Sequence, residues 1–442
     1  MKKTLVLGAG LVSKPLVRYL LDQPDFHVHC ASRTVSKAEK LIDGHERGKA
    51  TPLDLTNPKA LADLVPGADL VISLVPYAFH VQVAELCIQH KKLMVTTSYV
   101  SPAMKALDAK AKEAGVMILN EIGLDPGIDH MSAMRVFHDV RGRGGHIEEF
   151  MSYCGGLPAP EANTNPFGYK FSWSPRGVLL AGKNNASYLK DGERRDIPSK
   201  GLFEDRWTLD IQGEGEGYGK YQAYPNRDSI GYIDIYSLHK AKTVIRATLR
   251  NFGWCETLKA IVDLGFLDDE KRDLGGKTYG AVLAEMAGGS DPKKAVMKKL
   301  GIAADATPIT NMAWLGLFGD EKIPFDKGSY LDALEKIMLE KMGYGPGERD
   351  MIVLHHRFTA GGFSDGHKEH ITSTLIDFGI PKGDSAMSRT VGLPAAVATR
   401  YLLEGKIKGS GVHIPVSPEV YQPVLEELER LGIHCLEKSE TV

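Results

Sequence analysis

Short apolar segments alternate with amphipathic segments along the first 125 residues. The apolar segments predict strands at Thr4–Leu7, Val28–Ala31, Ala50–Leu53, Leu70–Val75, Met94–Thr96 and Val116–Leu119. The amphipathic segments predict helices at Ser13–Leu21, Ser36–Ile42, Pro58–Val65, His80–His90 and Ser101–Ala114. Strand–helix alternation at this spacing predicts an α/β fold, a parallel sheet doubly wound by helices on both faces. The strands are largely apolar, as expected when both faces of a sheet are covered.

The pattern changes near Gly145. Strand-like stretches then mix with Gly- and Pro-rich connections, which predicts an antiparallel or mixed sheet; they are Ile147–Tyr153, Ile230–Ser237 and Thr243–Leu249. A helical region from Cys255 to Met342 follows, with helices expected at Tyr279–Met286, Pro292–Leu300, Ile309–Leu317 and Ser329–Met342. Strands at Met351–Thr359 and Glu369–Asp377 are expected to form a hairpin around Asp365-Gly366. A last helix is predicted at Ser388–Leu403.

Composition narrows the classes of function. The chain has 442 residues with 54 Lys+Arg and 56 Asp+Glu, a net charge of −2 that leaves no basic surplus for nucleic acid. The five cysteines form no C-x-x-C pair, which favours a reducing cytoplasm. No apolar run of about 18 residues predicts a membrane span. The start, Met1-Lys2-Lys3, superficially resembles a secretory signal, but the glycines and polar residues that soon interrupt the apolar run favour a buried strand.

The sharpest local motif follows the first predicted strand. Gly8-Ala9-Gly10-Leu11-Val12-Ser13 places a Gly-x-Gly turn where a helix begins, so that backbone N–H groups can reach a pyrophosphate. Ser13 stands where a dinucleotide fold usually has its third glycine. The alternative is an ordinary strand-to-helix turn, and the position after the first strand of an α/β domain favours the dinucleotide site.

The end of the second predicted strand indicates which dinucleotide binds. Ser32-Arg33-Thr34 has no carboxylate for a ribose 2′-hydroxyl, whereas Arg33 can pair with a 2′-phosphate. We therefore expect NADP rather than NAD, the alternative being that Arg33 is a solvated loop cation. Asp54, after the third strand, is a candidate for the adenine side of the pocket.

Polar loops follow the later strands, at the sheet edge where open α/β sheets bind ligands. Thr97-Ser98-Tyr99 follows the fifth strand, and Glu121–His130 follows the sixth. Asp125, in the second loop, is either a ligand contact or simply the cap of a helix that begins there.

Several long strings resemble the saccharopine dehydrogenase family, in particular its NADP-dependent, glutamate-forming branch, saccharopine reductase. They are 97–104 (TSYVSPAM), 120–130 (NEIGLDPGIDH), 152–161 (SYCGGLPAPE), 168–174 (GYKFSWS), 224–229 (YPNRDS) and 345–350 (GPGERD). The resemblance therefore extends over essentially the whole chain. It implies an NADP-binding Rossmann domain (1–125 and 388–442), a mixed α/β substrate domain (126–254 and 343–387) and a helical insertion (255–342). The return of the C-terminal segment to the first domain rests mainly on the resemblance, and a cytoplasmic homodimer is expected.

The implied reaction joins L-glutamate to 2-aminoadipate 6-semialdehyde in lysine metabolism: the amine and aldehyde form an imine, and NADPH reduces it to saccharopine. The resemblance places substrate contacts at Ser98, Tyr99, Asp125, Arg227, Arg246, Ala247 and Thr248. Guanidinium groups suit the three carboxylates of saccharopine, and Asp125 suits an amino group. Ala247 departs mildly from the family, which has Gly there.

Cofactor contacts carried over from the family lie mainly in the N-terminal domain. They are Gly8, Gly10, Leu11, Val12, Ser13, Ser32, Arg33, Thr34, Asp54, Leu55, Val75, Thr97, Ser98, Leu124, Asp125, Pro126, Gly127, Ile128, Asp129, His130, Met131 and Ser174.

The group that moves protons is left open by the sequence. Imine formation takes a proton from an amine and gives one to a leaving hydroxyl, and Asp125, Tyr99 and Cys154 are the candidates. Cys154 could equally be a small buried residue. No metal is expected: His27 and His29 share one face of a strand, but Cys30 lies on the other.

Two other functions compete with this one. A carboxynorspermidine-type dehydrogenase of polyamine biosynthesis also condenses an amine with an aldehyde, but Arg227 and Arg246 favour a substrate with more carboxylates. A non-catalytic NADP-binding regulator of the same fold is disfavoured by the intact substrate-side strings.

Overall fold

The computed structural model describes all residues, Met1–Val442, and its contacts divide the chain into two compact units. Unit 1 consists of Met1–His146 and Gly361–Val442, and unit 2 of Ile147–Ala360. The helices are all too short or too polar to cross a membrane.

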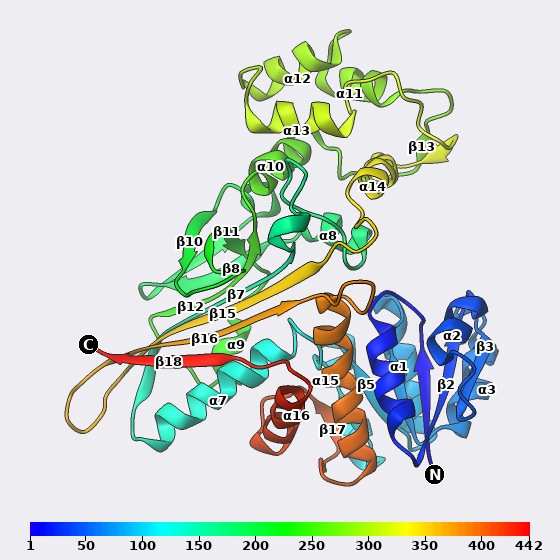
Figure 1. The fold of residues 1–442 in the computed structure, drawn as a ribbon, viewed down its shortest axis with the longest axis vertical. Coiled ribbons are helices and arrows are strands. Elements are labelled where there is room, and N and C mark those ends of the chain that lie inside the picture. The colour runs from blue at the N-terminus through cyan, green and yellow to red at the C-terminus, as the bar shows by residue number, and fades with distance from the viewer. The chain divides into compact units, whose positions relative to one another are not determined.

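Unit 1 contains a seven-stranded sheet in the order β17-β6-β5-β4-β1-β2-β3, and all its pairings are parallel. Figure 1 labels strands β17, β5, β2 and β3 of this sheet. The strands are β1 (Lys2–Leu7), β2 (Phe26–Ser32), β3 (Gly48–Pro52), β4 (Leu70–Ser73), β5 (Leu93–Thr96), β6 (Met117–Leu119) and β17 (Gly411–His413). The strand order reverses between β1 and β4, which is where a doubly wound sheet binds its ligand. The predicted parallel sheet is thus confirmed.

Helices connect these strands. They are α1 (Ser13–Asp22), α2 (Val35–Ile42), α3 (Pro58–Leu64), α4 (His80–Gln89), α5 (Pro102–Lys105) and α6 (Asp108–Glu113), with short 3₁₀ turns at Val65–Gly67 and Tyr77–Phe79. Local chemistry starts several of them: the Asn57 side chain accepts from backbone N–H groups at the start of α3, and Pro58 stands at its first position. The single helix predicted at Ser101–Ala114 is wrong, since α5 and α6 are separate. Leu107, between them, is buried in the core.

The C-terminal segment returns to unit 1, as the resemblance implied. Strand β17 extends the parallel sheet beside β6, and α15 (Ala386–Leu403) packs on α1. A Cβ on Gly392 of α15 would lie 2.7 Å from the Val12 carbonyl oxygen, so glycine allows the two helices to approach closely.

The segments 126–146 and 361–387 group with unit 1 by contact, although the sequence placed them in a substrate domain. The reason lies in their partners. Helix α7 (Ile128–Gly142) packs on α16 (Pro418–Arg430), and β16 (Glu369–Phe378) pairs with β18 (Leu436–Thr441). The three-domain division stays a prediction.

Unit 2 has a mixed sheet in the order β10-β11-β12-β7-β15. Strand β12 is parallel to β7 and antiparallel to β11, and β8 and β9 form a further antiparallel pair beside β12. The strands are β7 (His146–Pro158), β8 (Ala186–Lys190), β9 (Glu193–Ile197), β10 (Trp207–Ile211), β11 (Gly219–Pro225), β12 (Thr243–Arg250) and β15 (Asp350–Gly361).

The helices of unit 2 share a core with part of this sheet. They are α8 (Pro175–Ala181), α9 (Gly231–Ile235), α10 (Trp254–Leu264), α11 (Tyr279–Ala287), α12 (Pro292–Leu300), α13 (Thr307–Leu315) and α14 (Tyr330–Lys341), with 3₁₀ turns at Pro160–Ala162 and Ser199–Gly201 and a small β13 (Arg272–Asp273)–β14 (Lys327–Gly328) pair. Trp254, Leu258 and Tyr224 belong to one buried cluster with residues of α11, α13 and α14. The 255–342 helices therefore pack on the sheet through apolar contacts.

The strand predicted at Ile230–Ser237 is wrong, because this stretch forms helix α9. The Asp228 carboxylate accepts from the Ile230 N–H at 2.8 Å and favours a helical start. Tyr232 and Tyr236, four residues apart, are both buried with ring centres 5.3 Å apart. That spacing is helical, and packing outweighs the alternation that suggested a strand.

Candidate active site

The glycine turn after β1 is shaped by close backbone contact. Gly8 has φ +107°, and a Cβ there would lie 2.8 Å from the Leu74 carbonyl oxygen. The Ser13 hydroxyl accepts from the Gly10 N–H at 3.1 Å and lies 3.3 Å from the Gly8 carbonyl oxygen, to which it donates. Ser13 thus closes the turn with its side chain, where the common motif has a third glycine.

The same turn leaves room for an anion. A Cβ on Gly10 would meet nothing within 4 Å, and Gly10 and Leu11 are exposed. Helix α1 has no side-chain cap and no acidic residue in its first turn. The turn therefore leaves open space above Gly10 beside an uncapped helix start, and this end of the helix fits a dinucleotide pyrophosphate.

The loop after β2 contains the cation Arg33 and no acidic residue beside it. Ser32 is half-buried, and Arg33 and Thr34 are exposed. Asp54 lies near Arg33, after β3. The Thr56 hydroxyl and backbone N–H, more than Arg33, lower the pKa of the Asp54 carboxyl, so Asp54 is anionic at neutral pH. An exposed guanidinium and two hydroxyls suit a 2′-phosphate.

Ser98, Tyr99 and Asp125 lie together after β5 and β6. The Tyr99 hydroxyl donates to the Asp125 carboxylate at 2.9 Å, and all three residues are partly exposed. Asp125 does not cap α7, since that helix has Gly127 at its N-cap and no side-chain cap. The structure therefore removes the simple capping role and pairs Asp125 with a second candidate side chain.

Most of the segment 124–131 is buried behind Asp125. Its other members, Leu124 and Pro126–Met131, are buried, and the Asp129 carboxylate accepts from the Gly127 N–H at 2.6 Å. Any contact these residues make with a cofactor is therefore expected through backbone atoms. Leu55, Val75 and Thr97 are half-buried around the same edge of the sheet.

Glu121 is a residue of this region that the sequence did not single out. One of its carboxylate oxygens accepts from the Val100 N–H at 2.9 Å, and the other lies 2.7 Å from His130 Nε2. Both side chains are buried, and Glu121 has φ +57°. The pair ties the loop after β5 to the start of α7. The sequence feature that could have revealed this pair is a carboxylate and a histidine nine residues apart in a loop at the ligand-binding edge of the sheet.

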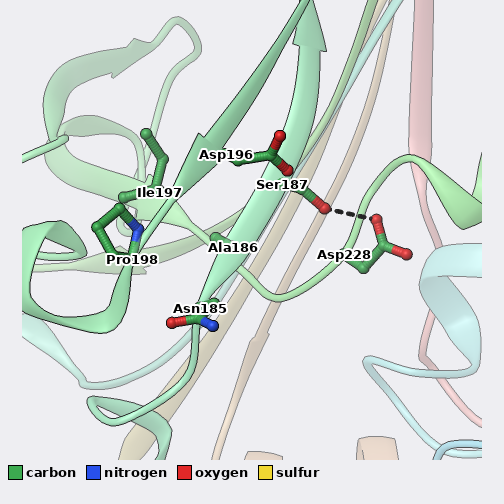
Figure 2. Close-up of a pocket in the computed structure, with 7 residues that line it drawn as sticks. All are labelled: Asn185, Ala186, Ser187, Asp196, Ile197, Pro198 and Asp228. Carbon is green, nitrogen blue, oxygen red and sulfur yellow. Dashed lines mark hydrogen bonds between the residues drawn. The ribbon is translucent and has the colours of Figure 1, made fainter.

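In unit 2, Arg227 lies on a tightly held loop. It is exposed and has φ +55°, and its carbonyl oxygen accepts from the Ser187 N–H at 2.9 Å. The Ser187 hydroxyl donates to Asp228 at 2.7 Å (Figure 2). A hollow of about 410 Å³ adjoins this loop, lined by Asn185, Ala186, Ser187, Asp196, Ile197, Pro198 and Asp228. Both carboxylates that line the hollow already have partners. Asp228 accepts from the Ile230 N–H within the loop, and Asp196 forms an ion pair with Arg194.

Arg246 lies beneath that loop on β12. Its side chain is 2% exposed, and the guanidinium lies 4.5 Å from the ring centre of Tyr232. Its backbone N–H donates to the Ser229 hydroxyl at 2.9 Å, and its carbonyl oxygen accepts from the Asn226 N–H at 2.8 Å. The Arg227 loop is thus fastened to β12 at the position of Arg246.

Thr248 and Cys154 are partners in the β12–β7 register, and Arg246 is opposite Ser152. Because paired residues share a face, Thr248 and Arg246 line one side of the sheet with Cys154. Ala247 is buried on the other side. Cys154 is itself buried, and Ser174 caps α8 by accepting from the Gly177 N–H at 3.2 Å.

The predicted site residues thus fall into two groups, one in each unit. Unit 1 holds the predicted cofactor contacts except Ser174, together with Ser98, Tyr99 and Asp125. Unit 2 holds Cys154, Ser174, Arg227 and Arg246–Thr248. No three His, Cys, Asp or Glu side chains gather as metal ligands anywhere in the chain.

Two family models match the chain. Residues 4–119 match the saccharopine dehydrogenase NADP binding domain, and residues 123–433 match the saccharopine dehydrogenase C-terminal domain. Together they span both units.

Full-length relatives match as well. Saccharopine dehydrogenase [NADP(+), L-glutamate-forming] from Saccharomyces cerevisiae is 42% identical over 450 residues, 99% of each chain. The mitochondrial alpha-aminoadipic semialdehyde synthase of Bos taurus is 40% identical over 98% of this chain but only 47% of its own length. The apo structure of the histidine-tagged glutamate-forming enzyme from S. cerevisiae superposes with a TM-score of 0.88 at 41% identity, covering 100% of both chains. The chain therefore belongs to the saccharopine dehydrogenase family.

Proposed function

We propose that this protein is an NADP-dependent oxidoreductase that interconverts saccharopine with L-glutamate and 2-aminoadipate 6-semialdehyde. The observation that carries the proposal is the match to glutamate-forming saccharopine dehydrogenases over 99% of both chains. In the synthetic direction the amine attacks the aldehyde, water leaves, and the imine carbon accepts a hydride with its electron pair while the nitrogen keeps one proton. NADPH supplies that hydride when bound.

Ser98, Tyr99 and Asp125 are proposed to hold the reacting nitrogen. A carboxylate that accepts from a tyrosine hydroxyl at 2.9 Å can hold a substrate ammonium group and accept its proton, while the phenol keeps the carboxylate oriented. Water can protonate the leaving hydroxyl. Cys154 is the less suitable of the three proton carriers considered, because it is buried on the sheet.

Arg227, Arg246 and Thr248 are proposed to bind substrate carboxylates. A guanidinium binds a carboxylate through two parallel hydrogen bonds, and the two arginines are joined through the backbone of one loop. The exposed Arg227 would meet the substrate first, and the buried Arg246 would fix its final position. Ala247, on the opposite side of the strand, would contribute only backbone groups.

The cofactor is proposed to bind with its pyrophosphate at the Gly8–Ser13 turn and its 2′-phosphate at Ser32-Arg33-Thr34. The open space above Gly10 and the uncapped start of α1 support the first contact. The absence of an acid at the end of β2 supports the second.

We further propose a cytoplasmic homodimer. The five cysteines are free, and four of them are buried, which suits a reducing compartment. Light scattering after size-exclusion chromatography would give the oligomeric state, and a single species at 48.3 kDa would overturn the dimer.

The direct test of the activity follows NADPH by absorbance with L-glutamate plus the semialdehyde, and NADP⁺ reduction with saccharopine. We expect turnover in both directions. The same assay with carboxynorspermidine and its precursors separates the polyamine alternative. Turnover with those compounds but not with saccharopine would overturn the proposal, and binding of NADPH without any turnover would favour a regulator.

A further inference from the structure

A buried histidine lies directly beneath Ser98. His80 Nε2 is 2.8 Å from the Ser98 hydroxyl, and His80 Nδ1 is 2.8 Å from the Ser73 hydroxyl. Ser98 is partly exposed, whereas His80 and Ser73 are 3% and 0% exposed. The three side chains thus form a chain of hydrogen bonds that runs from the surface of unit 1 into its core.

Burial determines the charge of this histidine. It lowers the pKa of His80 to about 4, so the ring is neutral near pH 7. A neutral imidazole has one N–H donor and one acceptor nitrogen. The two serines must therefore play opposite roles: one hydroxyl donates to the ring and the other accepts from it. The ring consequently determines which way the Ser98 hydroxyl proton points.

The chain of bonds is not a route for protons. Ser73 is fully buried at the end of β4, and its hydroxyl bonds to His80 alone. No second group accepts a hydrogen bond from its hydroxyl. A neutral ring with such a low pKa also makes a poor base at neutral pH. The geometry therefore suits orientation of the Ser98 hydroxyl and not proton transfer.

The backbone of Ser98 is held independently of His80. The Ser98 carbonyl oxygen accepts from the Glu121 N–H at 3.1 Å, and its N–H donates to the Thr96 hydroxyl at 3.4 Å. Substitution of His80 should thus release the side chain of Ser98 while the loop stays in place.

We propose that His80 is a positioning residue that orients the Ser98 hydroxyl toward the amino-acid substrate. This rests on the proposed function, since it needs Ser98 to contact that substrate. Ser73 serves the same purpose one step further away, because its hydrogen bond to Nδ1 fixes the rotation of the His80 ring.

Two amide substitutions separate the two hydrogen bonds. The His80→Asn amide nitrogen replaces Nδ1 and can keep the bond to Ser73, whereas the His80→Gln amide reaches the place of Nε2 and can keep the bond to Ser98. We expect His80→Asn to raise the KM for saccharopine about five- to tenfold, the loss of one hydrogen bond, and His80→Gln to raise it less than about twofold. Tm should change little and equally in both variants.

A double-mutant cycle with Ser98→Ala provides the decisive comparison. If His80 acts through the Ser98 hydroxyl, His80→Asn should change KM less than about twofold once that hydroxyl is gone. His29→Asn is the matched control, because His29 Nε2 also lies 2.8 Å from a threonine hydroxyl, that of Thr51, but is bonded to no site residue.

The outcomes separate the two proposals. Equal effects of His80→Asn with and without Ser98, or equal effects of the Asn and Gln variants, would show that His80 only supports the fold. A silent Ser98→Ala in an active enzyme would also overturn the role of His80. An inactive wild-type protein would overturn the proposed function, and the role of His80 in it.

Discussion

Two sets of buried charges, one in each unit, are stabilised in different ways. In unit 1, carboxylates are held by directional hydrogen bonds, as Glu121 is by the Val100 N–H and His130, and Asp129 by the Gly127 N–H. In unit 2, Arg250 lies 4.8 Å from the ring centre of Tyr169 and 5.5 Å from that of Trp254. A carboxylate needs N–H or O–H donors, whereas a guanidinium can also be stabilised by aromatic faces.

This difference bears on what each unit does. Hydrogen bonds to Glu121 and Asp129 fix the backbone of the loops around Ser98, Tyr99 and Asp125. Aromatic stacking instead fixes the plane of a guanidinium while its edge stays able to donate: the Arg250 Nε has no hydrogen-bond partner. In unit 1 hydrogen bonds thus fix loops, whereas in unit 2 aromatic rings orient a buried guanidinium that also donates to the Leu249 carbonyl oxygen at 2.7 Å.

The largest effect is expected at the buried arginine of the substrate group. Arg246→Ala should weaken saccharopine binding by about 2–5 kcal/mol, because it removes a buried partner of a carboxylate. Arg246→Lys should recover only part of this, since it keeps the charge but loses the planar fork. NADPH Kd should stay within about twofold. Calorimetric titration of both ligands into both variants measures this, and equal weakening of the two ligands would show a structural role only.

A smaller loss is expected at the exposed arginine. Arg227→Ala should cost about 1–2 kcal/mol in saccharopine binding, because solvent screens an exposed pair. Asp228→Asn, which weakens the acceptor that holds the loop, should raise the KM for saccharopine without changing NADPH Kd. If Arg227→Ala leaves saccharopine binding unchanged while Arg246→Ala weakens it, the Arg227 loop covers the site without binding the substrate.

In unit 1, loss of a carboxylate should reduce stability. Glu121→Ala leaves the Val100 N–H and the His130 ring without their acceptor, and we expect the free energy of unfolding to fall by about 2–3 kcal/mol. Glu121→Gln keeps one acceptor oxygen and should lose about half as much. Urea unfolding with a common slope measures both. An unchanged midpoint for Glu121→Ala would contradict the view that carboxylates fix these loops.

The preference for NADPH over NADH tests the proposed contact of the exposed Arg33 in unit 1 with a 2′-phosphate. We expect kcat/KM to favour NADPH over NADH by at least about tenfold, or 1.4 kcal/mol. Arg33→Ala should remove most of that preference and leave the NADH kinetics nearly unchanged. Equal losses with both cofactors would mean that Arg33 does not contact a 2′-phosphate.

The smallest effect concerns an ion pair near the surface of unit 1. Bonding to Arg143, and less strongly to His367, lowers the pKa of Glu369 to about 2. A carboxyl whose pKa is lower in the folded state stabilises the fold above its unfolded pKa, near 4.5, and loses that contribution as the pH falls toward 2. Glu369→Gln should therefore cost about 1 kcal/mol at pH 7 and almost nothing at pH 2. A difference from wild type that does not shrink with pH would contradict this account.

The sequence determined what depends on short-range chemistry. The glycine turn, the strand–helix alternation and the Ser32-Arg33-Thr34 loop follow from local periodicity and residue type, and the first six strands formed where expected, with small shifts of their ends. Long specific strings such as that at 120–130 also led to the family. In these places the residues that define the feature are neighbours in the chain.

Only the tertiary structure decided which distant residues meet. The alternation of apolar and polar residues at α9 favours a strand. The segment forms a helix instead, because its two tyrosines pack on each other. Residues 126–146 and 361–387 join unit 1 through β16–β18 and α7–α16 contacts that no local pattern encodes. His80 was merely the start of a predicted helix, and its place between Ser73 and Ser98 appears only once β4, α4 and the loop after β5 are assembled. Burial and hydrogen bonding are properties of that assembly, which is why the residues that orient the site were missed by a sequence pattern.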